Sequence, residues 1–497
     1  MRQLFLRLVN SRSVLSGALL YIAMRWFDRL AGVVSTIVLA RLLTPSDFGV
    51  VAVATVVLGL ASVMLDFGIQ VTVVQIRNLE RADIDTAWTL RLLQNAVIAA
   101  ILILSSGWTG DYYRDARLAS VLVVLGVAYL IDGLTGMGPV VFQKRQQYAR
   151  EVAFFMFRRA GGLVVTIILA LWLRDYWALV IGTLLSNMIG VVLSYAMHPL
   201  APRLTLARWR RFIGASVWLT LHSISGYASL QIDKLIVGRR DGASILGAYS
   251  LADQIAAMPT SELLAPMNRA LFPAMAAMQD DLPRLREAFL SGLGIQTMLA
   301  MPAAIGLALV APDVVVVMLG QQWVAAGPVM TALALAYGVN ALTHSGVYLM
   351  NSLGHYRALA LLRLSMLAGL VLLTFVVCPT SKAIELAWFR AGLGVMTIGA
   401  VARMTLSYLP GVGVLSMMRV TGRPVMATLM MVATVTAIMS MAIDLVPWQR
   451  LVIAVTGGAS AYAVGLAGFW QLAGRPPGAE SWALVKMRAA WTAIRGS

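Results

Sequence analysis

Charged side chains inside long apolar stretches are the residues of this sequence whose chemistry needs an explanation. Nine of them are basic: Arg25, Arg29, Arg91, Arg158, Arg159, Lys234, Arg363, Arg390 and Arg403. A basic side chain at the centre of a membrane-spanning helix costs about 2.5–3.5 kcal/mol on the scale derived from membrane insertion. Arg363, Arg403 and Arg158 stand nearer the ends of their stretches and can extend towards the interface at lower cost. The deeper cations need a polar partner or a cavity.

In the first apolar stretch, polar residues recur at three- and four-residue spacing and therefore share one face of a helix. That face holds Tyr21, Arg25, Asp28, Arg29, Gly32 and Thr36, and the opposite face holds Ala23, Phe27, Leu30 and Val34. Pairing of Asp28 with Arg25, three residues apart, would leave the charge of Arg29 uncompensated. Comparable stripes contain Arg91 in the third stretch, Arg159 in the fifth and Lys234 in the seventh.

The chemistry that such stripes support is anion binding. Residues 1–198 hold five arginines inside apolar stretches but only three acids there, so at least two positive charges lack a carboxylate. A guanidinium presents paired donors that suit a phosphate. The structural alternative is a network of interhelical ion pairs that includes Asp66 and Asp132. We predict a cavity at bilayer depth that binds an anionic, phosphate-bearing substrate through Arg25, Arg29, Arg91, Arg159 and Lys234.

Carboxylates inside apolar stretches are candidates for coupling transport to an ion gradient, because such a group is costly unless it has a role. We predict this role for Asp66, Asp132 and Asp253, whereas Glu262 lies near the end of its stretch. The four histidines are scattered over different stretches and are interpreted as packing residues. The sequence contains no phosphate-binding loop, metal-ligand spacing or nucleophile motif. It therefore predicts no catalytic residues, no metal and no cofactor.

The elements that must carry these residues are membrane-spanning helices. The sequence is 60% hydrophobic and 12% charged, with a mean hydropathy of +0.81, whereas soluble domains carry about 25% charged residues. Apolar runs long enough to cross a bilayer recur along the whole chain. They predict an all-α polytopic membrane protein with about fourteen spans, centred near residues 28, 57, 95, 126, 163, 188, 224, 257, 299, 338, 368, 397, 436 and 461.

The distribution of basic residues predicts the topology. An even number of spans places both termini on one side. If that side is the cytoplasm, roughly 22 of the 39 lysines and arginines fall in cytoplasmic segments and about 8 in the opposite loops, in agreement with the positive-inside rule. The net charge of +17 is then a consequence of orientation. Nucleic-acid binding is not expected, because the densest basic stretch, Gln143–Arg150, is too short to form such a site.

A weak internal repeat predicts how the spans are grouped. Leu43–Ala52 lies between the first two spans, and Asp241–Ser250 lies between the seventh and eighth, about 198 residues later. The alternative is coincidence, because any short turn between helices favours Gly, Pro and Asp. We predict four parts: an N-terminal lobe of six spans (1–198), a basic cytoplasmic linker (199–211), a C-terminal lobe of six spans (212–408), and two further spans with a cytoplasmic tail (409–497).

Several short motifs then suggest a family. They are Ala40–Gly49, Asp66–Gly68, Pro266–Pro273 followed by Gln279–Asp281, Leu319–Trp323 and Leu353–Gly354. In combination they resemble the Wzx-type polysaccharide flippases, and within them the colanic-acid exporter-like subgroup of the multidrug/oligosaccharidyl-lipid/polysaccharide exporter superfamily. The resemblance covers about residues 10–410. The intramembrane arginines lie outside these motifs, so the resemblance assigns no substrate-binding residue.

The resemblance implies a two-lobed, V-shaped bundle whose central cavity opens alternately to each face of the bacterial inner membrane. It would move undecaprenyl-diphosphate-linked oligosaccharide repeat units for exopolysaccharide or lipopolysaccharide assembly, without enzymatic activity. The implied partners are the lipid-linked oligosaccharide, membrane lipid and the polysaccharide assembly machinery. Two other classes remain open. A multidrug exporter would move organic cations, for which surplus arginine is electrostatically unfavourable, and a polysaccharide polymerase or ligase would need a large periplasmic loop.

Overall fold

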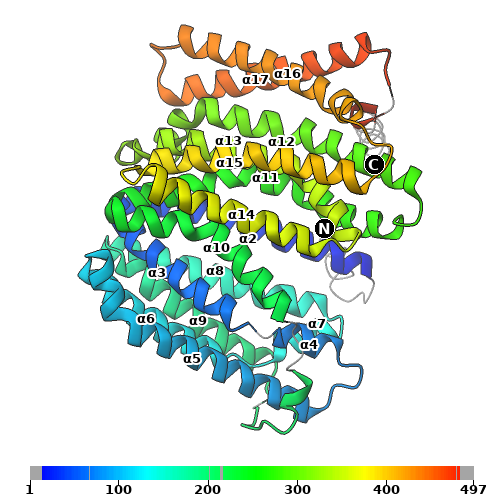
Figure 1. The fold of residues 1–497 in the computed structure, drawn as a ribbon. Coiled ribbons are helices and arrows are strands. Elements are labelled where there is room, and N and C mark those ends of the chain that lie inside the picture. The colour runs from blue at the N-terminus through cyan, green and yellow to red at the C-terminus, as the bar shows by residue number, and fades with distance from the viewer. Residues whose placement is uncertain (1–13, 67, 201, 213–216, 477, 482–497) are drawn as a thin grey trace, which may run out of the picture. The chain divides into compact units, whose positions relative to one another are not determined.

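A computed structural model describes residues 14–66, 68–200, 202–212, 217–476 and 478–481. Within these ranges all regular structure is helical (Figure 1). The helices up to residue 240 are α2 (Val14–Leu42), α3 (Pro45–Met64), α4 (Ile69–Gln75), α5 (Arg81–Tyr113), α6 (Ala116–Gly133), α7 (Gly138–Lys144), α8 (Tyr148–Leu173), α9 (Trp177–Met197), the 3-10 turn η1 (Trp209–Arg211) and α10 (Val217–Arg240).

The later helices are also long. They are α11 (Gly242–Ala277), α12 (Leu282–Met318), the short η2 (Gln321–Trp323), α13 (Ala326–Ser352), α14 (Tyr356–Leu372) with the π-helical turn η3 (Leu373–Val377), α15 (Ala383–Tyr408), α16 (Val414–Met441) and α17 (Pro447–Leu472). Prolines 259, 266 and 273 lie inside α11, and each removes one backbone donor from the helix. Proline is tolerated in membrane helices because neighbouring groups satisfy the freed carbonyls.

Eleven of the described helices are long and apolar enough to cross a membrane. Each of the fourteen predicted centres falls within one long helix. The three long helices outside the eleven are α2, α10 and α11, which carry charges such as Arg25, Asp233 and Asp253. The all-helical membrane architecture is therefore confirmed, and the number of fourteen spans stays a prediction.

Contacts between helices divide the chain into two compact units, Met1–Gly247 and Ala248–Ser497. The sequence instead places the division at the basic linker, residues 199–211. The two boundaries differ because α10, which follows the linker, packs against α3 and α5 and therefore belongs to the first unit. The two-lobe arrangement drawn from the repeat stays a prediction, and each unit is described below by itself.

In the first unit, helix caps explain where the long helices begin. Thr44 and Asp47 form a capping box at the start of α3: the Asp47 carboxylate accepts the Thr44 backbone N–H at 2.8 Å. Pro45 occupies the first turn, where its missing N–H costs nothing. Asp115 is the N-cap residue of α6, and its side chain accepts the backbone N–H of Arg117 at 3.1 Å. In this unit α2 packs against α8, α5 against α6, and α8 against α9.

Two glycines of the first unit allow a reciprocal backbone contact between α3 and the start of α11. A β-carbon on Gly49 would lie 1.7 Å from the Ala243 carbonyl oxygen, and one on Gly247 would lie 1.8 Å from the Pro45 carbonyl oxygen. Only glycine permits approaches this close. The contact follows the repeat, because 243 − 45 and 247 − 49 both equal 198. Each copy of the repeated turn thus packs on the glycine of the other copy.

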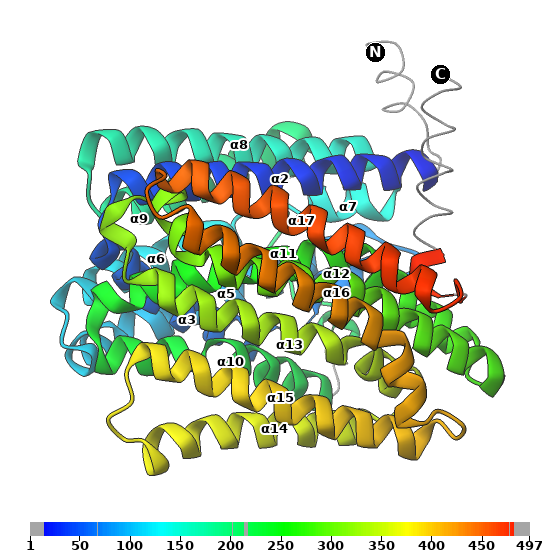
Figure 2. The same cartoon turned by 90° about the horizontal axis from the view of Figure 1, so that it is seen from above.

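In the second unit, α12 is central: it packs against α13, α16 and α17. Figure 2 shows α16 beside α17 and α14 beside α15. The guanidinium of Arg450 on α17 binds the Asp313 carboxylate on α12, with Nε at 2.7 Å, and this pair ties α17 to α12.

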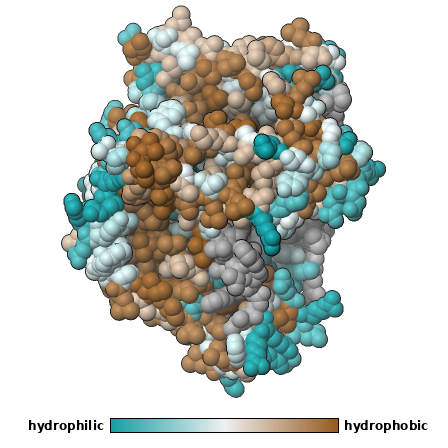
Figure 3. Space-filling model, in the orientation of Figure 1, coloured by the Kyte–Doolittle hydropathy of each residue, from teal (hydrophilic) through white to brown (hydrophobic). Residues whose placement is uncertain are grey.

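In the space-filling view of Figure 3, apolar side chains cover the middle of the face, and hydrophilic ones gather towards its left and right edges. This distribution is typical of helices that cross a bilayer.

Candidate functional site

The polar stripe of α2 faces largely inward, as predicted. Ile22, Trp26 and Leu30 are 53–61% exposed, whereas Arg25 and Arg29 are half-buried. The exception is the side chain of Asp28, which is 63% exposed. The sequence placed all polar residues of this stripe on one buried face. Asp28 and Arg29 stand about 100° apart around the helix, so the two side chains point in different directions, and that of Asp28 lies at the exposed edge of the stripe.

Asp28 pairs with α8. Its carboxylate lies 2.9 Å from the Nε atom of Arg159, and the two side chains are 63% and 47% exposed. The sequence matched Asp28 with Arg25 on the same helix. The terminal nitrogen of Arg159 also lies against Gly32, where a β-carbon would be 3.4 Å away. Arg159, a predicted substrate-binding residue, therefore stands beside α2 in an exposed ion pair.

A second contact between α2 and α8 involves a carboxylate that the sequence analysis did not single out. The Tyr21 hydroxyl donates to Glu151 at 2.5 Å, and the Tyr21 ring meets Tyr148 edge to face at 5.9 Å. Glu151 is 4% exposed in the first turn of α8. The acids of the first unit were thus undercounted, because Glu151 directly follows the basic stretch Gln143–Arg150 and lies before the apolar run.

Asp132, a predicted coupling residue, is the centre of a charged cluster. Its carboxylate accepts from Arg91 of α5 at 2.9 Å and from Arg158 of α8 at 2.7 Å. Arg158 also donates to the side-chain oxygen of Asn187 on α9 at 2.9 Å. The side chains of Arg91, Asp132 and Arg158 are 16–25% exposed. The cluster joins α5, α6, α8 and α9. It agrees with the ion-pair network that the sequence analysis kept as the alternative for Asp132 but not for Asp66, which that alternative also included.

Arg158 is a correction to the sequence analysis. It was assigned to the end of a span, from which its side chain could extend to the interface. The structure places it in the middle of α8, with its guanidinium turned to Asp132 and Asn187. The apolar run alone placed the start of this helix too late in the chain, because α8 begins at Tyr148 within a polar segment.

Asp66 lies outside the long helices. It is exposed in the turn between α3 and α4, where its side chain accepts the Gly68 backbone N–H at 2.9 Å. Gly68 has a φ of 65°, a conformation that a glycine adopts without strain. This hydrogen bond holds the Asp66 side chain against Gly68, the N-cap residue of α4. Lys234 is half-buried on α10, next to Asp233, which is 1% exposed and which the sequence analysis also passed over.

In the second unit, Asp253 of α11 is held by two residues. It accepts from the Tyr337 hydroxyl of α13 at 2.7 Å and from Arg390 of α15 at 3.0 Å. Arg390 also donates to the Tyr337 oxygen at 3.1 Å and lies 4.9 Å from the centre of that ring. The Asp253 and Arg390 side chains are 8% and 11% exposed. This third predicted coupling carboxylate thus joins three helices.

Replacing Tyr337 by Phe tests how far this trio stabilises the second unit. The change removes one bond to a carboxylate and one from a guanidinium, so we expect a loss of about 1.5–3 kcal/mol in the free energy of unfolding. Thermal unfolding of the purified protein measures it. Tyr356→Phe is the control, because Tyr356 is 60% exposed. Equal unfolding temperatures for the two variants would exclude a structural role for the trio.

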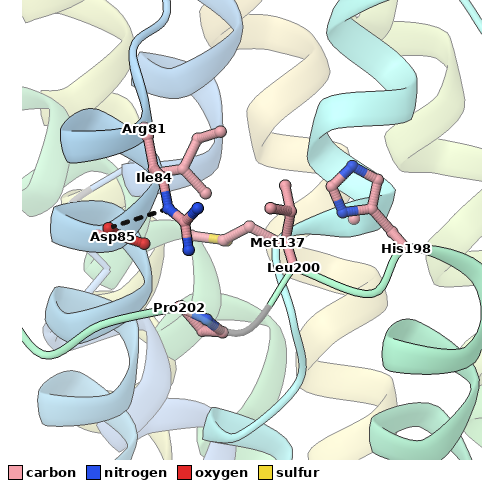
Figure 4. Close-up of a pocket in the computed structure, with 8 residues that line it drawn as sticks. Arg81, Ile84, Asp85, Met137, His198, Leu200 and Pro202 are labelled. Atoms are coloured by element: carbon pink, nitrogen blue, oxygen red, sulfur yellow. Dashed lines mark ion pairs between the residues drawn. The ribbon is translucent and has the colours of Figure 1, made fainter.

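A pocket opens at the start of α5 in the first unit. Its lining is Arg81, Ile84, Asp85, Met137, Gly138, His198, Leu200 and Pro202. Figure 4 shows Arg81 and Asp85 on one side and His198 on the other. Burial lowers the pKa of His198, and the positive charges of Arg145 and Arg150 act in the same direction. His198 is therefore neutral at pH 7. Among the described residues, no group of three or more His, Cys, Asp or Glu side chains is placed to hold a metal.

Two solved structures of similar fold are titled as a flippase and a transporter. A structure titled "Lipid II flippase MurJ, inward closed conformation" superposes with a TM-score of 0.70 at 9% identity, covering 91% of this chain and 99% of that one. An inward-facing multidrug resistance transporter of the MATE family in the MOP superfamily gives 0.55 at 14% identity, covering 80% and 95%. At such low identity these matches establish a shared fold.

Three similar sequences are also informative. An uncharacterized membrane protein in the cps region of Klebsiella pneumoniae is 27% identical, covering 61% of this chain and 64% of that protein. The lipopolysaccharide biosynthesis protein WzxC of Escherichia coli is 26% identical, covering 61% and 63%, and the succinoglycan biosynthesis transport protein ExoT of Rhizobium meliloti is 26% identical, covering 61% and 62%. The aligned part of the chain spans less than two thirds of each relative.

The family match agrees with these relatives. Residues 38–328 match a family described as polysaccharide biosynthesis protein, and this region is more than half of the 497 residues. The predicted resemblance to Wzx-type proteins is thereby confirmed. The chain belongs to the polysaccharide biosynthesis protein family.

Proposed function

We propose that this protein is a flippase that moves undecaprenyl-diphosphate-linked oligosaccharide repeat units across the bacterial inner membrane by alternating access. The observation that carries the proposal is the family match over residues 38–328 in a chain with a flippase-like fold. The repeat units would serve exopolysaccharide or lipopolysaccharide assembly, alongside the proteins that polymerise them. Both termini would lie in the cytoplasm, in accord with the distribution of basic residues.

The diphosphate would bind among the inward cations of the first unit. Arg25 and Arg29 are half-buried on α2, and the nearby Arg159 is held by Asp28 in a pair exposed enough for a phosphate to replace the carboxylate. Lys234 on α10 would add a further positive charge. Arg91 is more enclosed and shares Asp132 with Arg158, so we assign it the role of positioning the cluster.

Alternating access needs a contact that closes one end of the pathway and later opens. The reciprocal packing of Gly49 on Ala243 and of Gly247 on Pro45 is suited to be such a closing contact. It joins two backbones without a side chain between them, so a small separation breaks it completely. We propose that it closes the end of the first unit opposite the basic linker when the substrate site faces the cytoplasm.

Substitution of Gly49 by Ala tests this closing contact. The added methyl would lie 1.7 Å from the Ala243 carbonyl oxygen, so the closed state cannot form without a backbone shift, and we expect export to fall at least tenfold. A cysteine at Ser46, introduced after Cys378→Ser, should react faster with an external membrane-impermeant thiol reagent in the Gly49→Ala protein. Gly107→Ala in α5 is the control, because a β-carbon there meets open space.

Reconstitution tests the function itself. The purified protein is placed in vesicles with a fluorescent undecaprenyl-diphosphate oligosaccharide, and the probe's access to an impermeant quencher is followed with time. We expect the protein to speed probe movement between leaflets, and empty vesicles provide the baseline. Transport of an ethidium-like dye without movement of the lipid would instead indicate a multidrug exporter, and formation of longer oligosaccharides would indicate a polymerase.

A further inference from the structure

The basic linker of the first unit is a structured segment with an unexplained outer face. We call residues 202–212 the strap. Arg208 donates to Glu80 at 2.6 Å and to Asp83 at 3.2 Å, and Arg211 donates to Asp83 at 3.1 Å. Asp83 is fully buried in the first turn of α5. A buried carboxylate that receives two guanidinium groups holds this segment firmly in place.

Backbone bonds extend this attachment along α5. The backbone N–H of Arg203 donates to Asp85 at 3.2 Å, and that of Thr205 donates to the Thr89 hydroxyl at 3.0 Å. At its end, Phe212 is 1% exposed and packs in an apolar cluster that includes Trp88. The strap is therefore fixed to α5 at both ends, and its outward side chains have a definite position.

Those outward side chains combine apolar and basic groups. Leu204, Leu206 and Trp209 are 73%, 46% and 42% exposed. Arg203 and Arg210 are exposed beside them, and the guanidinium of Arg210 lies 5.8 Å from the centre of the Trp209 ring. Three large apolar side chains facing water within six residues would be unfavourable. Tryptophan, leucine and arginine together are typical of a surface at the boundary between water and lipid.

Helix α4, which packs near the strap, also exposes apolar side chains. Val71 and Val74 of α4 are 59% and 38% exposed. Lys144 of α7 donates to the carbonyl oxygens of Val73, Val74 and Ile76 at the C-terminal end of α4, which places a positive charge beside them. Helices α4 and α7 lie at the same end of the first unit as the start of α5 (Figure 1). The strap and α4 thus expose apolar and basic side chains at the same end of the first unit, where Phe212 of the strap and Val73 of α4 share one buried cluster.

We infer that the outward face of the strap binds the anionic phospholipid headgroups of the cytoplasmic leaflet. Leu204, Leu206 and Trp209 would enter the headgroup region, and Arg203 and Arg210 would bind the lipid phosphates. Charge complementarity selects anionic lipid, because basic side chains near such a surface are attracted by the negative leaflet. The inference rests on the proposed cytoplasmic position of this end of the unit and is independent of which substrate is moved.

Thermal unfolding of the purified full chain in detergent tests this assignment. Added phosphatidylglycerol should raise the unfolding temperature more than phosphatidylcholine does. The double variant Arg203→Gln/Arg210→Gln should weaken the apparent affinity for phosphatidylglycerol about 25-fold, since one basic residue contributes about fivefold near an anionic surface. The control is Arg114→Gln/Arg174→Gln, which makes the same charge change at exposed positions at the opposite end of the helices and should leave the affinity unchanged.

Three results would overturn the inference. One is an equal affinity for phosphatidylglycerol in the strap and control variants. Another is full stabilisation by millimolar inorganic phosphate, which would indicate a simple anion site. The third is a strap variant that binds phosphatidylglycerol normally but fails in export, which would indicate a protein partner. Failure of the proposed flippase function remains distinguishable, because lipid binding is measured here without any oligosaccharide substrate.

Discussion

Replacing Asp132 by Asn should lower the free energy of unfolding by about 3–5 kcal/mol, because it removes the single carboxylate shared by two guanidinium groups. Arg91 and Arg158 reach this carboxylate at 2.9 and 2.7 Å from different helices. Asparagine keeps the shape but presents an uncharged group to both cations. Their mutual repulsion would then act between α5 and α8. We expect a lower unfolding temperature for the purified protein and less protein in the membrane.

Asp66→Asn is the matched control, because it makes the same chemical change in an exposed turn. Adding Arg158→Gln to Asp132→Asn should recover part of the loss, since one of the two cations is then removed. The predicted coupling role of Asp132 gives the opposite pattern. In that case Asp132→Asn would fold and unfold like the original protein, and its transport would no longer depend on an ion gradient.

The positions of the long helices could be predicted from the sequence because apolar run length is a local property. Every predicted centre lies in one long helix of the structure. The face of a helix was also predictable, as the exposed Trp26 and half-buried Arg29 of α2 illustrate. The ends of the helices were less predictable from the sequence. Polar residues that open α8 look like a loop in sequence, and this misplaced both Glu151 and Arg158.

The partners of the charged residues could not be predicted, because periodicity tells which side of a helix is polar but not which helix packs there. Asp28 was matched with Arg25 by spacing, whereas it binds Arg159 on α8. Nothing in the sequence connects Tyr337 with Asp253, 84 positions away. In both cases the contact depends on the packing of helices that are distant in the chain.

The strap shows a different limit. Its basic composition was evident, and it was interpreted as a linker whose charge follows from orientation. The residues that hold it, Glu80, Asp83 and Asp85, stand at the start of α5, where acids are also expected as helix-capping residues. Asp83 serves both as a helix-capping residue and as an attachment point for the strap. Its carboxylate accepts the Glu80 backbone N–H at 3.0 Å and also binds the guanidinium groups of Arg208 and Arg211. A helix start that also binds a distant segment has no separate signal in the sequence.

The Asp28–Arg159 pair gives the second large expected effect, because its two partners should respond in opposite directions if Arg159 binds the substrate. Arg159→Ala removes a charge-assisted contact to phosphate worth roughly 1.5–3 kcal/mol, which weakens affinity for the lipid-linked oligosaccharide about ten- to a hundredfold. Arg159→Lys should keep part of that affinity as a point charge. Asp28→Asn removes a carboxylate that competes with the phosphate for the guanidinium. We therefore expect it to strengthen substrate binding.

Stability should change little in these variants, since both side chains are about half exposed and exposed ion pairs contribute about 0–1 kcal/mol. Binding of the lipid-linked oligosaccharide and unfolding temperature, measured together on the three purified variants, separate the two roles. A purely structural pair predicts the same modest loss of stability for Asp28→Asn and Arg159→Ala, with parallel losses of binding. Parallel losses of this kind would exclude Arg159 from the substrate site. Binding of the diphosphate would then be assigned to Arg25, Arg29 and Lys234.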